Sequence, residues 1–356
     1  MEFDLIRTHF ALPFQHLADA SHPRIIRGIG DDCARLRPDD GQVMVISTDL
    51  LESGIHFFDD ASAFELGWKS LAVNLSDLAA CGAEPLGFVL GLGLSSVCHD
   101  WLSGFSRGLL AAAQEYNCPL VGGDTTRRQS GLGISITVMG QHPASHQGYD
   151  RAAAQLADRV WVTGVPGLAR LGLLLECQSR GLPLSLPPFS QEHLLALLNS
   201  TPALVRSKAL DALHKPRPPL QFSMALRPIV HAALDLSDGM TGDLAHIASA
   251  SKLGIELEED ALDCVWQQVW GDSKLDFAFS RALALSGGDD YQLAFCAQET
   301  RSEEIQWLGS RHQVQVTPIG RVCSSEGMFF RSLNGNVRPL AIGSFAHFAF
   351  LKPSHD

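Results

Sequence analysis

The sequence predicts a two-domain protein of the α/β class, in its wider sense α+β. A chain of 356 residues exceeds the size of one average core, so two domains are expected. Apolar runs of strand length alternate with segments whose apolar residues recur at helical spacing. A polar stretch at 142–148, with Pro143 and Gly148, interrupts this pattern and places the domains at 1–146 and 147–356.

The elements of each half follow from these patterns. In the first half we expect strands at 43–46, 86–94 and 132–139, and helices at 64–82 and 101–116. In the second half we expect strands at 160–163, 232–236, 292–296 and 315–319, and helices ending at 176 and spanning 241–251 and 303–308. Residues 180–221 are rich in proline and indicate no chemistry.

Composition limits the partners of the chain. With 27 Lys and Arg against 39 Asp and Glu, the net charge of −12 argues against nucleic acid or an anionic membrane as main partner. We find no signal peptide, no apolar run of membrane-spanning length and no CxxC pair among the 8 cysteines. A soluble cytoplasmic protein without a zinc site or a disulfide framework is therefore expected.

The helix at 64–82 carries polar residues in its most apolar part, namely Asn74, Ser76 and Asp77. Asn74 and Asp77 are one turn apart and so point the same way. An ionised carboxylate on a buried helix is costly unless it is hydrogen-bonded, paired or bound to a metal. For one Asp a cap or a buried hydrogen bond is sufficient; the number of similar residues elsewhere favours a metal.

Acidic residues beside Gly, Ser or Thr recur along the chain. Leu-Ser-Asp occurs at 75–77 and 236–238, and Gly-Gly-Asp at 122–124 and 287–289. The candidates are Asp31, Asp32, Asp49, Asp77, Asp124, Asp235, Asp238, Asp289 and Asp290. Two carboxylates about 4 Å apart repel by roughly 4 kcal/mol at an effective dielectric of about 20, so a cluster of them requires cations. Oxygen ligands without a His or Cys cluster favour Mg²⁺, although Asp beside Gly is also common turn chemistry.

Magnesium held by few carboxylates completes its coordination with water and substrate phosphates, which indicates nucleotide chemistry. The sequence contains neither a GxxxxGK[ST] loop nor the protein-kinase signatures. The Gly-Gly turn at 122–123 and the Ser-Asp-Gly turn at 237–239 could instead present backbone N–H groups to phosphates.

Several motifs together resemble those of the thiamine-monophosphate kinase family, in the aminoimidazole ribonucleotide synthetase-like superfamily. They are GIGDDCA (28–34), STDLLESGIHF (47–57), KSLAVNLSDLAACGAEP (69–85), VGGDTTR (121–127), DLSDG (235–239) and SGGDDYQL (286–293). They occur in family order over most of the chain, and only the proline-rich stretch lacks a counterpart. The resemblance implies an N-terminal mixed sheet with helices, through which the protein dimerises, and a C-terminal α/β domain.

The resemblance also implies the reaction: Mg²⁺-dependent, direct in-line transfer of the ATP γ-phosphoryl group to thiamine monophosphate, giving thiamine diphosphate and ADP in a homodimer. The implied ligands of several Mg²⁺ ions are Asp32, Ser47, Thr48, Asp49, Asp77, Asp124, Asp235 and Asp238, of which Asp49, Asp77 and Asp124 are catalytic. The implied ATP contacts are Gly123, Asp124, Arg151 and Ser237, and the implied substrate contacts are His56, Asp289 and Phe345.

Two positions depart from the family pattern. The family has Glu where this chain has Asp289, and Trp or Tyr where it has Phe345. The shorter acid reaches less far, and Phe stacks on a pyrimidine without hydrogen-bonding. A structural histidine is the alternative for His56, and a solvated charge is the alternative for Arg151.

Other readings remain at this stage. Selenophosphate synthetase would need a Cys or selenocysteine and a Lys near the N-terminus, and residues 1–27 contain neither Cys nor Lys. The hydrogenase-maturation relative would need a C-terminal cysteine, whereas the chain ends KPSHD. Aminoimidazole ribonucleotide synthetase, a non-catalytic Mg-nucleotide sensor and a metal-dependent phosphatase stay open as alternatives.

Overall fold

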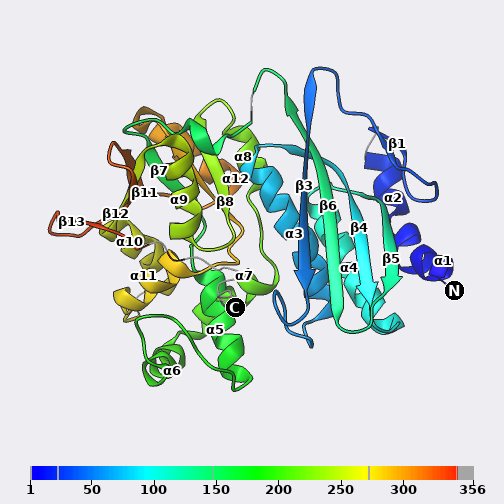
Figure 1. Cartoon of the computed structure of the whole chain (residues 1–356), viewed down its shortest axis with the longest axis horizontal. Helices are drawn as coiled ribbons and strands as arrows, with labels where there is room; N and C mark the ends of the chain where they lie inside the picture. The colour runs from blue at the N-terminus through cyan, green and yellow to red at the C-terminus, as the bar shows by residue number, and fades with distance from the viewer. Residues whose placement is uncertain (1, 22–23, 147, 272, 342, 344–356) are drawn as a thin grey trace, which may run out of the picture. The chain divides into compact units, whose positions relative to one another are not determined.

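The computed structural model describes residues 2–21, 24–146, 148–271, 273–341 and 343 (Figure 1). The chain divides into two compact units, each with its own sheet. The first unit comprises Met1–Tyr149 and His214–Pro228, and the second comprises Asp150–Leu213 and Ile229–Asp356. In the part of the chain that the structure describes, no helix is long and apolar enough to cross a membrane.

The first unit contains one central sheet and two short flanking strands. Its elements are α1 (Glu2–Ile6), the π-helix η1 (Arg7–Ala11), α2 (Leu12–Ser21), β1 (Ile25–Arg27), β2 (Arg35–Leu36), β3 (Gln42–Glu52), α3 (Ala63–Ala80), β4 (Glu84–Leu94), α4 (His99–Glu115), β5 (Leu120–Arg127), β6 (Leu132–Pro143) and α8 (Leu220–Ala225). The central sheet has the order β3-β6-β4-β5, in which only β4 and β5 are parallel. This is the mixed sheet that the family resemblance implied.

One face of this sheet is covered by α3 and α4, which lie behind it in Figure 1. Along β3 the side chains alternate between the two faces. Ser47 and Asp49 contact α3, whereas Ile46 and Leu50 point the other way and are 62% and 56% exposed. The uncovered face is therefore partly apolar.

The segment 214–228 packs against α3. Trp68 Nε1 donates to the Pro216 carbonyl at 2.9 Å, and the Ser223 hydroxyl donates to the Ala79 carbonyl. The sequence assigned this segment to the second domain because the only boundary was placed at the polar stretch 142–148. Its buried side-chain hydrogen bonds instead attach it to the first unit.

Two strands extend through residues that the sequence placed in turns. Strand β3 includes Ser47, Thr48 and Asp49, which were expected to follow a shorter strand, and β5 includes Gly123 and Asp124. Continuous pairing with β6 and β4 extends the two strands. The prediction of loop ligands is therefore wrong for these positions, because their side chains project from a rigid sheet.

The second unit is built on a seven-stranded sheet of order β13-β12-β9-β11-β7-β10-β8. Its elements are η2 (Arg151–Ala153), β7 (Arg159–Thr163), α5 (Leu168–Ser179), α6 (Gln191–Ser200), α7 (Ala203–His214), β8 (Val230–Leu236), α9 (Met240–Ser251), β9 (Gly254–Glu258), α10 (Glu259–Trp270), α11 (Phe277–Ser286), β10 (Gln292–Ala297), η3 (Glu299–Arg301), α12 (Ser302–His312), β11 (Val316–Cys323), β12 (Gly327–Arg331) and β13 (Val337–Pro339). The first residue of β10 pairs with the last of β8, Gln292 with Leu236. The segments 237–239 and 286–291 therefore meet at one end of this sheet.

Candidate functional site

Ser47 and Asp77 form the closest contact among the candidate residues of the first unit. The Ser47 hydroxyl lies 2.5 Å from Asp77 Oδ2 and donates a hydrogen bond to it. Ser47 projects from β3 toward α3, and Asp77 lies in the last turn of α3. This bond connects β3 to the last turn of α3 and orients the Asp77 carboxyl group.

Asn74 links the same two elements one helical turn earlier. Its Oδ1 accepts the backbone N–H of Asp49 at 3.0 Å, and its Nδ2 donates to the Ser70 carbonyl at 3.0 Å. Strand β3 is at the edge of its sheet, where alternate N–H groups have no strand partner. Asn74 supplies such a partner, so Asn74 and Asp77 both fasten α3 to the part of β3 that carries Ser47 and Asp49.

Thr48 points to the opposite face of the sheet. Its hydroxyl donates to the Ile136 carbonyl at 3.0 Å and lies 2.9 Å from the Thr137 hydroxyl. The strand backbone therefore separates the Thr48 hydroxyl from the Ser47–Asp77 pair.

Asp124 lies at the far edge of the sheet. Asp49 on β3 is in register with Ile136, Leu90 and Gly123, so the row beside Asp124 crosses four strands. Three spacings of about 4.8 Å separate the outer strands by roughly 14 Å. A magnesium ion binds ligands at about 2.1 Å, so one ion cannot hold Asp49 and Asp124 of the same chain.

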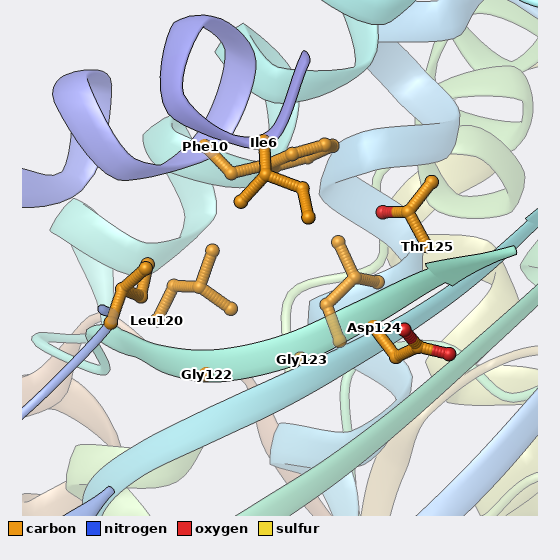
Figure 2. Close-up of a pocket in the computed structure, with 9 residues that line it drawn as sticks. Ile6, Phe10, Leu120, Gly122, Gly123, Asp124 and Thr125 are labelled. Carbon is orange, nitrogen blue, oxygen red and sulfur yellow. The ribbon is translucent and has the colours of Figure 1, made fainter. Parts of the chain in front are cut away.

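A small hollow of about 50 Å³, open to solvent, lies beside Gly123 (Figure 2). Ile6 and Phe10 of the N-terminal helices line one side of it. A Cβ at Gly123 would lie 2.1 Å from the Leu90 carbonyl oxygen, so only glycine fits there. Figure 2 shows Asp124 pointing away from Ile6 and Phe10, on the other side of β5.

Asp32 lies in an exposed turn on the β5 side of the unit. Its backbone N–H donates to Asp31 Oδ1 at 3.0 Å, and Arg27 Nε lies 3.4 Å from Asp31 Oδ2. Ile29 of the same turn lines the hollow beside Gly123. The turn thus lies against β5, while Asp49 and Asp77 lie on the β3 side.

In the second unit, the turn at 237–239 is closed by Asp243. Asp243 Oδ2 accepts the backbone N–H groups of Ser237, Asp238 and Gly239, each at 3.1 Å. The expectation that these N–H groups bind phosphate is therefore wrong, because a side chain already occupies them. Burial raises the pKa of Asp243 to about 6, and the N–H donors oppose this rise.

Asp290 has a similar structural task. Its Oδ2 and Oδ1 accept the N–H groups of Gly167 at 2.6 Å and Ala169 at 3.2 Å, which caps the start of α5. Burial raises the pKa of Asp290 to about 8. Its neighbour Asp289 adopts a positive φ of 70° and donates its N–H to the Ser237 carbonyl at 2.8 Å. Asp290 is therefore a helix cap, whereas Asp289 belongs to the loop that contacts 237–239.

The remaining predicted residues of this unit are spread along α9 and β8. Asp235 is buried in β8, and Asp238 is exposed in the turn after it. The Arg151 carbonyl accepts the Ser251 hydroxyl at 2.9 Å, at the last residue of α9. A helix rises about 1.5 Å per residue, so the backbone of Arg151 is roughly 16 Å from Ser237, at the other end of α9.

Of two predicted substrate contacts, only His56 lies in the described part of the chain. His56 Nδ1 accepts the Glu52 N–H at 3.0 Å, so the ring carries its proton on Nε2 when neutral. Phe345 lies outside the described residues.

The donor atoms near β3 fit Mg²⁺ but do not form a complete cage. Among the residues with described positions, no three His, Cys, Asp or Glu side chains are gathered to hold a metal. Ser47 and Asp77 offer oxygen ligands that contact each other, and Asp49 lies two residues after Ser47 on the same face of β3. Mg²⁺ needs only one or two carboxylates when water and phosphates complete its shell. A closed zinc-type site is not formed by these residues.

Some functional positions were not recognised from the sequence. Asp243 lies in the first turn of α9, where an acidic residue suggests a helix-end interaction. Its three N–H partners, however, depend on the path of the preceding turn. Ile6 and Phe10 also line the hollow, and no local sequence pattern places them beside Gly123.

Known proteins of one family are similar to this protein over almost the whole chain. The model of the AIR synthase related protein N-terminal domain matches residues 30–142. A thiamine-monophosphate kinase of Salmonella typhimurium is 36% identical over 92% of this chain and 93% of its own length, and one of Haemophilus influenzae is 33% identical over 98% of each. The chain belongs to the thiamine-monophosphate kinase family.

Solved structures support the same assignment for this member of the thiamine-monophosphate kinase family. A thiamine-monophosphate kinase from Stenotrophomonas maltophilia is 36% identical, with a TM-score of 0.73 over 92% of this chain and 94% of its own. AaThiL, solved in complex with AMPPCP and TMP, is 25% identical with a TM-score of 0.68 over 98% and 97%. The predicted family, the fold class and the activity class of ATP-dependent phosphotransferase are therefore confirmed.

Proposed function

We propose that this member of the thiamine-monophosphate kinase family transfers the ATP γ-phosphoryl group to thiamine monophosphate with Mg²⁺ bound at Asp49 and Asp77. The observation that carries the site assignment is the pair of links between β3 and α3, Ser47 to Asp77 and Asn74 to Asp49. They hold two carboxylates on rigid elements inside the segment that matches the family model. AaThiL, a relative over nearly the whole chain, was solved with AMPPCP and TMP.

The acceptor makes this chemistry possible without a strong base. Thiamine monophosphate is a phosphate monoester with a second pKa of about 6, so it is mostly dianionic at neutral pH. Magnesium supplies charge neutralisation between the two polyanions and alignment for in-line attack. Asp49 and Asp77 would hold the ion, and the Ser47 hydroxyl keeps one Asp77 oxygen oriented.

For the nucleotide, the proposed contacts are Gly123, Asp124, Arg151 and Ser237. Gly123 borders the hollow, which is apolar on the side of Ile6 and Phe10, and its missing Cβ leaves room for the Leu90 carbonyl of the neighbouring strand. Because Asp124 is about three strand spacings from Asp49, we assign Asp32 and Asp124 to a metal position separate from that of Asp49 and Asp77. Thr48, Asp235 and Asp238 stay proposed ligands.

For the acceptor, the proposed contacts are His56, Asp289 and Phe345. His56 is oriented through Nδ1, and the Asp289 backbone is fastened to Ser237. Asp289 stands where the family has the longer Glu. The backbone hydrogen bond to Ser237 therefore sets how far its carboxylate reaches toward the acceptor. The proposed domains remain 1–146 and 147–356, with 214–228 packed on the first.

We further propose a homodimer that pairs the uncovered faces of the four-stranded sheets. Ile46 and Leu50 are exposed on that face, together with Met44 of the same strand. Exposed apolar side chains gathered on one face are typical of an interaction surface. The proposed compartment is the cytoplasm, since the reaction consumes ATP.

One assay tests the reaction. The protein is incubated with ATP and Mg²⁺, with and without thiamine monophosphate, and ADP, thiamine diphosphate and inorganic phosphate are measured. The proposal predicts equal amounts of ADP and thiamine diphosphate only when both the acceptor and Mg²⁺ are present. Inorganic phosphate released without acceptor would indicate a phosphatase, and no ADP at all would indicate a nucleotide sensor.

A further inference from the structure

Asp243 is a buried carboxylate with an unusual concentration of hydrogen bonds. It is 5% exposed and lies in the first turn of α9. One of its oxygens, Oδ2, accepts three consecutive backbone N–H groups, from Ser237, Asp238 and Gly239. Consecutive N–H groups that converge in this way form an anion-binding nest, and the anion here is part of the protein.

The nest fixes the turn that carries Asp238. The three N–H bonds hold the turn from the side of α9, and the Asp289 N–H holds the Ser237 carbonyl from the other side at 2.8 Å. The space around the turn is also limited, since a Cβ at Gly239 would lie 3.3 Å or less from the backbone of Ser286 and the next residue. Without Asp243, three N–H groups would lose their acceptor, and the turn would lose its side-chain link to α9.

We propose that Asp243 is a positioning residue, which holds the turn 237–239 so that Asp238 and Ser237 can bind Mg²⁺ and nucleotide. This inference rests on the proposed function, because that function assigns the two residues as ligands. Asp243 acts on the turn through its Oδ2, which is directed at three backbone N–H groups. A residue that orients ligands in this way affects metal affinity even though it does not touch the metal.

The proposal differs from a purely structural role in what it predicts for magnesium. Partners that orient metal ligands change metal affinity by about 10- to 100-fold when they are removed. A residue that only stabilises the fold lowers the fraction of folded protein and leaves the Mg²⁺ requirement of the folded molecules unchanged. The Mg²⁺ concentration at half-maximal response therefore separates the two roles.

The test compares the unaltered protein with Asp243→Ala and Asp243→Asn. Asp276→Ala is the matched control, because Asp276 accepts the Phe279 N–H at 3.0 Å and caps α11 without contacting the turn. Two responses are titrated with Mg²⁺: turnover with ATP and thiamine monophosphate, and the rise in Tm with a non-hydrolysable ATP analogue. Amide hydrogen exchange of a peptide covering 237–239 is followed in the absence of ligands.

We expect Asp243→Ala to raise the half-maximal Mg²⁺ concentration about tenfold or more, and to speed exchange of the 237–239 amides by a similar factor. Asp243→Asn keeps one acceptor oxygen, so both changes are smaller. Asp276→Ala leaves the Mg²⁺ response unchanged. If Asp243→Ala does not fold, Asp243→Asn alone decides the matter, with a several-fold change expected in both measurements.

Three results would overturn the proposal. Unchanged amide exchange would show that Asp243 does not hold the turn. Faster exchange with an unchanged Mg²⁺ response would reduce its role to stability. A full loss of Mg²⁺ response in Asp243→Asn, with the amides still protected, would make the charge itself a ligand. If the unaltered protein shows the Tm response but no turnover, the proposed function fails while the Tm titration still decides the role of Asp243.

Discussion

Replacing Asn74 by Ala tests whether the helix α3 positions the carboxylate of Asp49. Asn74 is 1% exposed, and its Oδ1 accepts the Asp49 backbone N–H at 3.0 Å. The substitution leaves that N–H without its acceptor, and an unsatisfied buried donor costs about 1–3 kcal/mol. We therefore expect the free energy of unfolding to fall by about 2 kcal/mol. Because Asp49 would no longer be held against α3, kcat/KM should fall by roughly 10- to 100-fold.

The matched control for this change is Ser70→Ala on the same helix. Ser70 is equally buried, but its hydroxyl bonds only the Leu66 carbonyl four residues earlier, which keeps its helical hydrogen bond. This control should cost less than about 1 kcal/mol and leave kcat/KM within about twofold. Urea unfolding gives the stabilities, and the coupled ADP assay gives the rates.

Two outcomes would contradict this prediction. If Asn74→Ala matched Ser70→Ala in both stability and kcat/KM, the bond from Asn74 to Asp49 would have no positioning role. A loss of stability without a loss of rate would assign Asn74 to folding alone. Only a combined loss, absent from the control, supports a site built by fastening β3 to α3.

Further predictions concern metal, pH and assembly. Asp77→Asn and Asp49→Asn should each abolish turnover while urea midpoints stay near normal; near-normal rates at limiting Mg²⁺ would disprove the shared metal site. Because burial raises the pKa of Asp290 from 3.8 to about 8, the folded chain retains a proton that the unfolded chain has lost, so the free energy of unfolding should fall as pH rises from about 4 to about 8. Asp290→Asn should flatten this fall, as measured by urea unfolding across that range, and an unchanged slope would contradict it. Ile46→Lys combined with Leu50→Lys should convert a dimer to monomer in sedimentation, and a persisting dimer would exclude this face.

The predicted Mg²⁺ ligands show what sequence motifs can indicate about a site and what they cannot. The resemblance assigned Asp32, Asp49, Asp77 and Asp124 to Mg²⁺, and the structure brings Asp77 and Asp49 to the same pair of elements. Asp124 instead lies on the opposite edge strand of the same sheet. Sequence motifs indicate which residues share a function. The distance between these residues depends on the order of the strands in the sheet, which local sequence patterns do not encode.

The sequence alone determined the local elements. Helix α3 follows from apolar residues at helical spacing, from Ser62 capping the Glu65 N–H, and from the glycine at 82 with φ +63° that ends it. In the second unit, short apolar runs predicted β7, β8, β10 and β11, whereas β9, β12 and β13 were not predicted. Spacing and turn residues act over a few positions, so they can be read directly.

Only the tertiary structure decided which polar groups are already satisfied. In the folded chain, Asp243 accepts the N–H groups of the turn 237–239, and Asp290 caps α5. The segment 214–228 belongs to the first unit. Each of these depends on contacts between segments whose approach is set by packing of the whole unit. A buried N–H group donates to whichever acceptor the fold brings near, so the identity of that acceptor is fixed only in three dimensions.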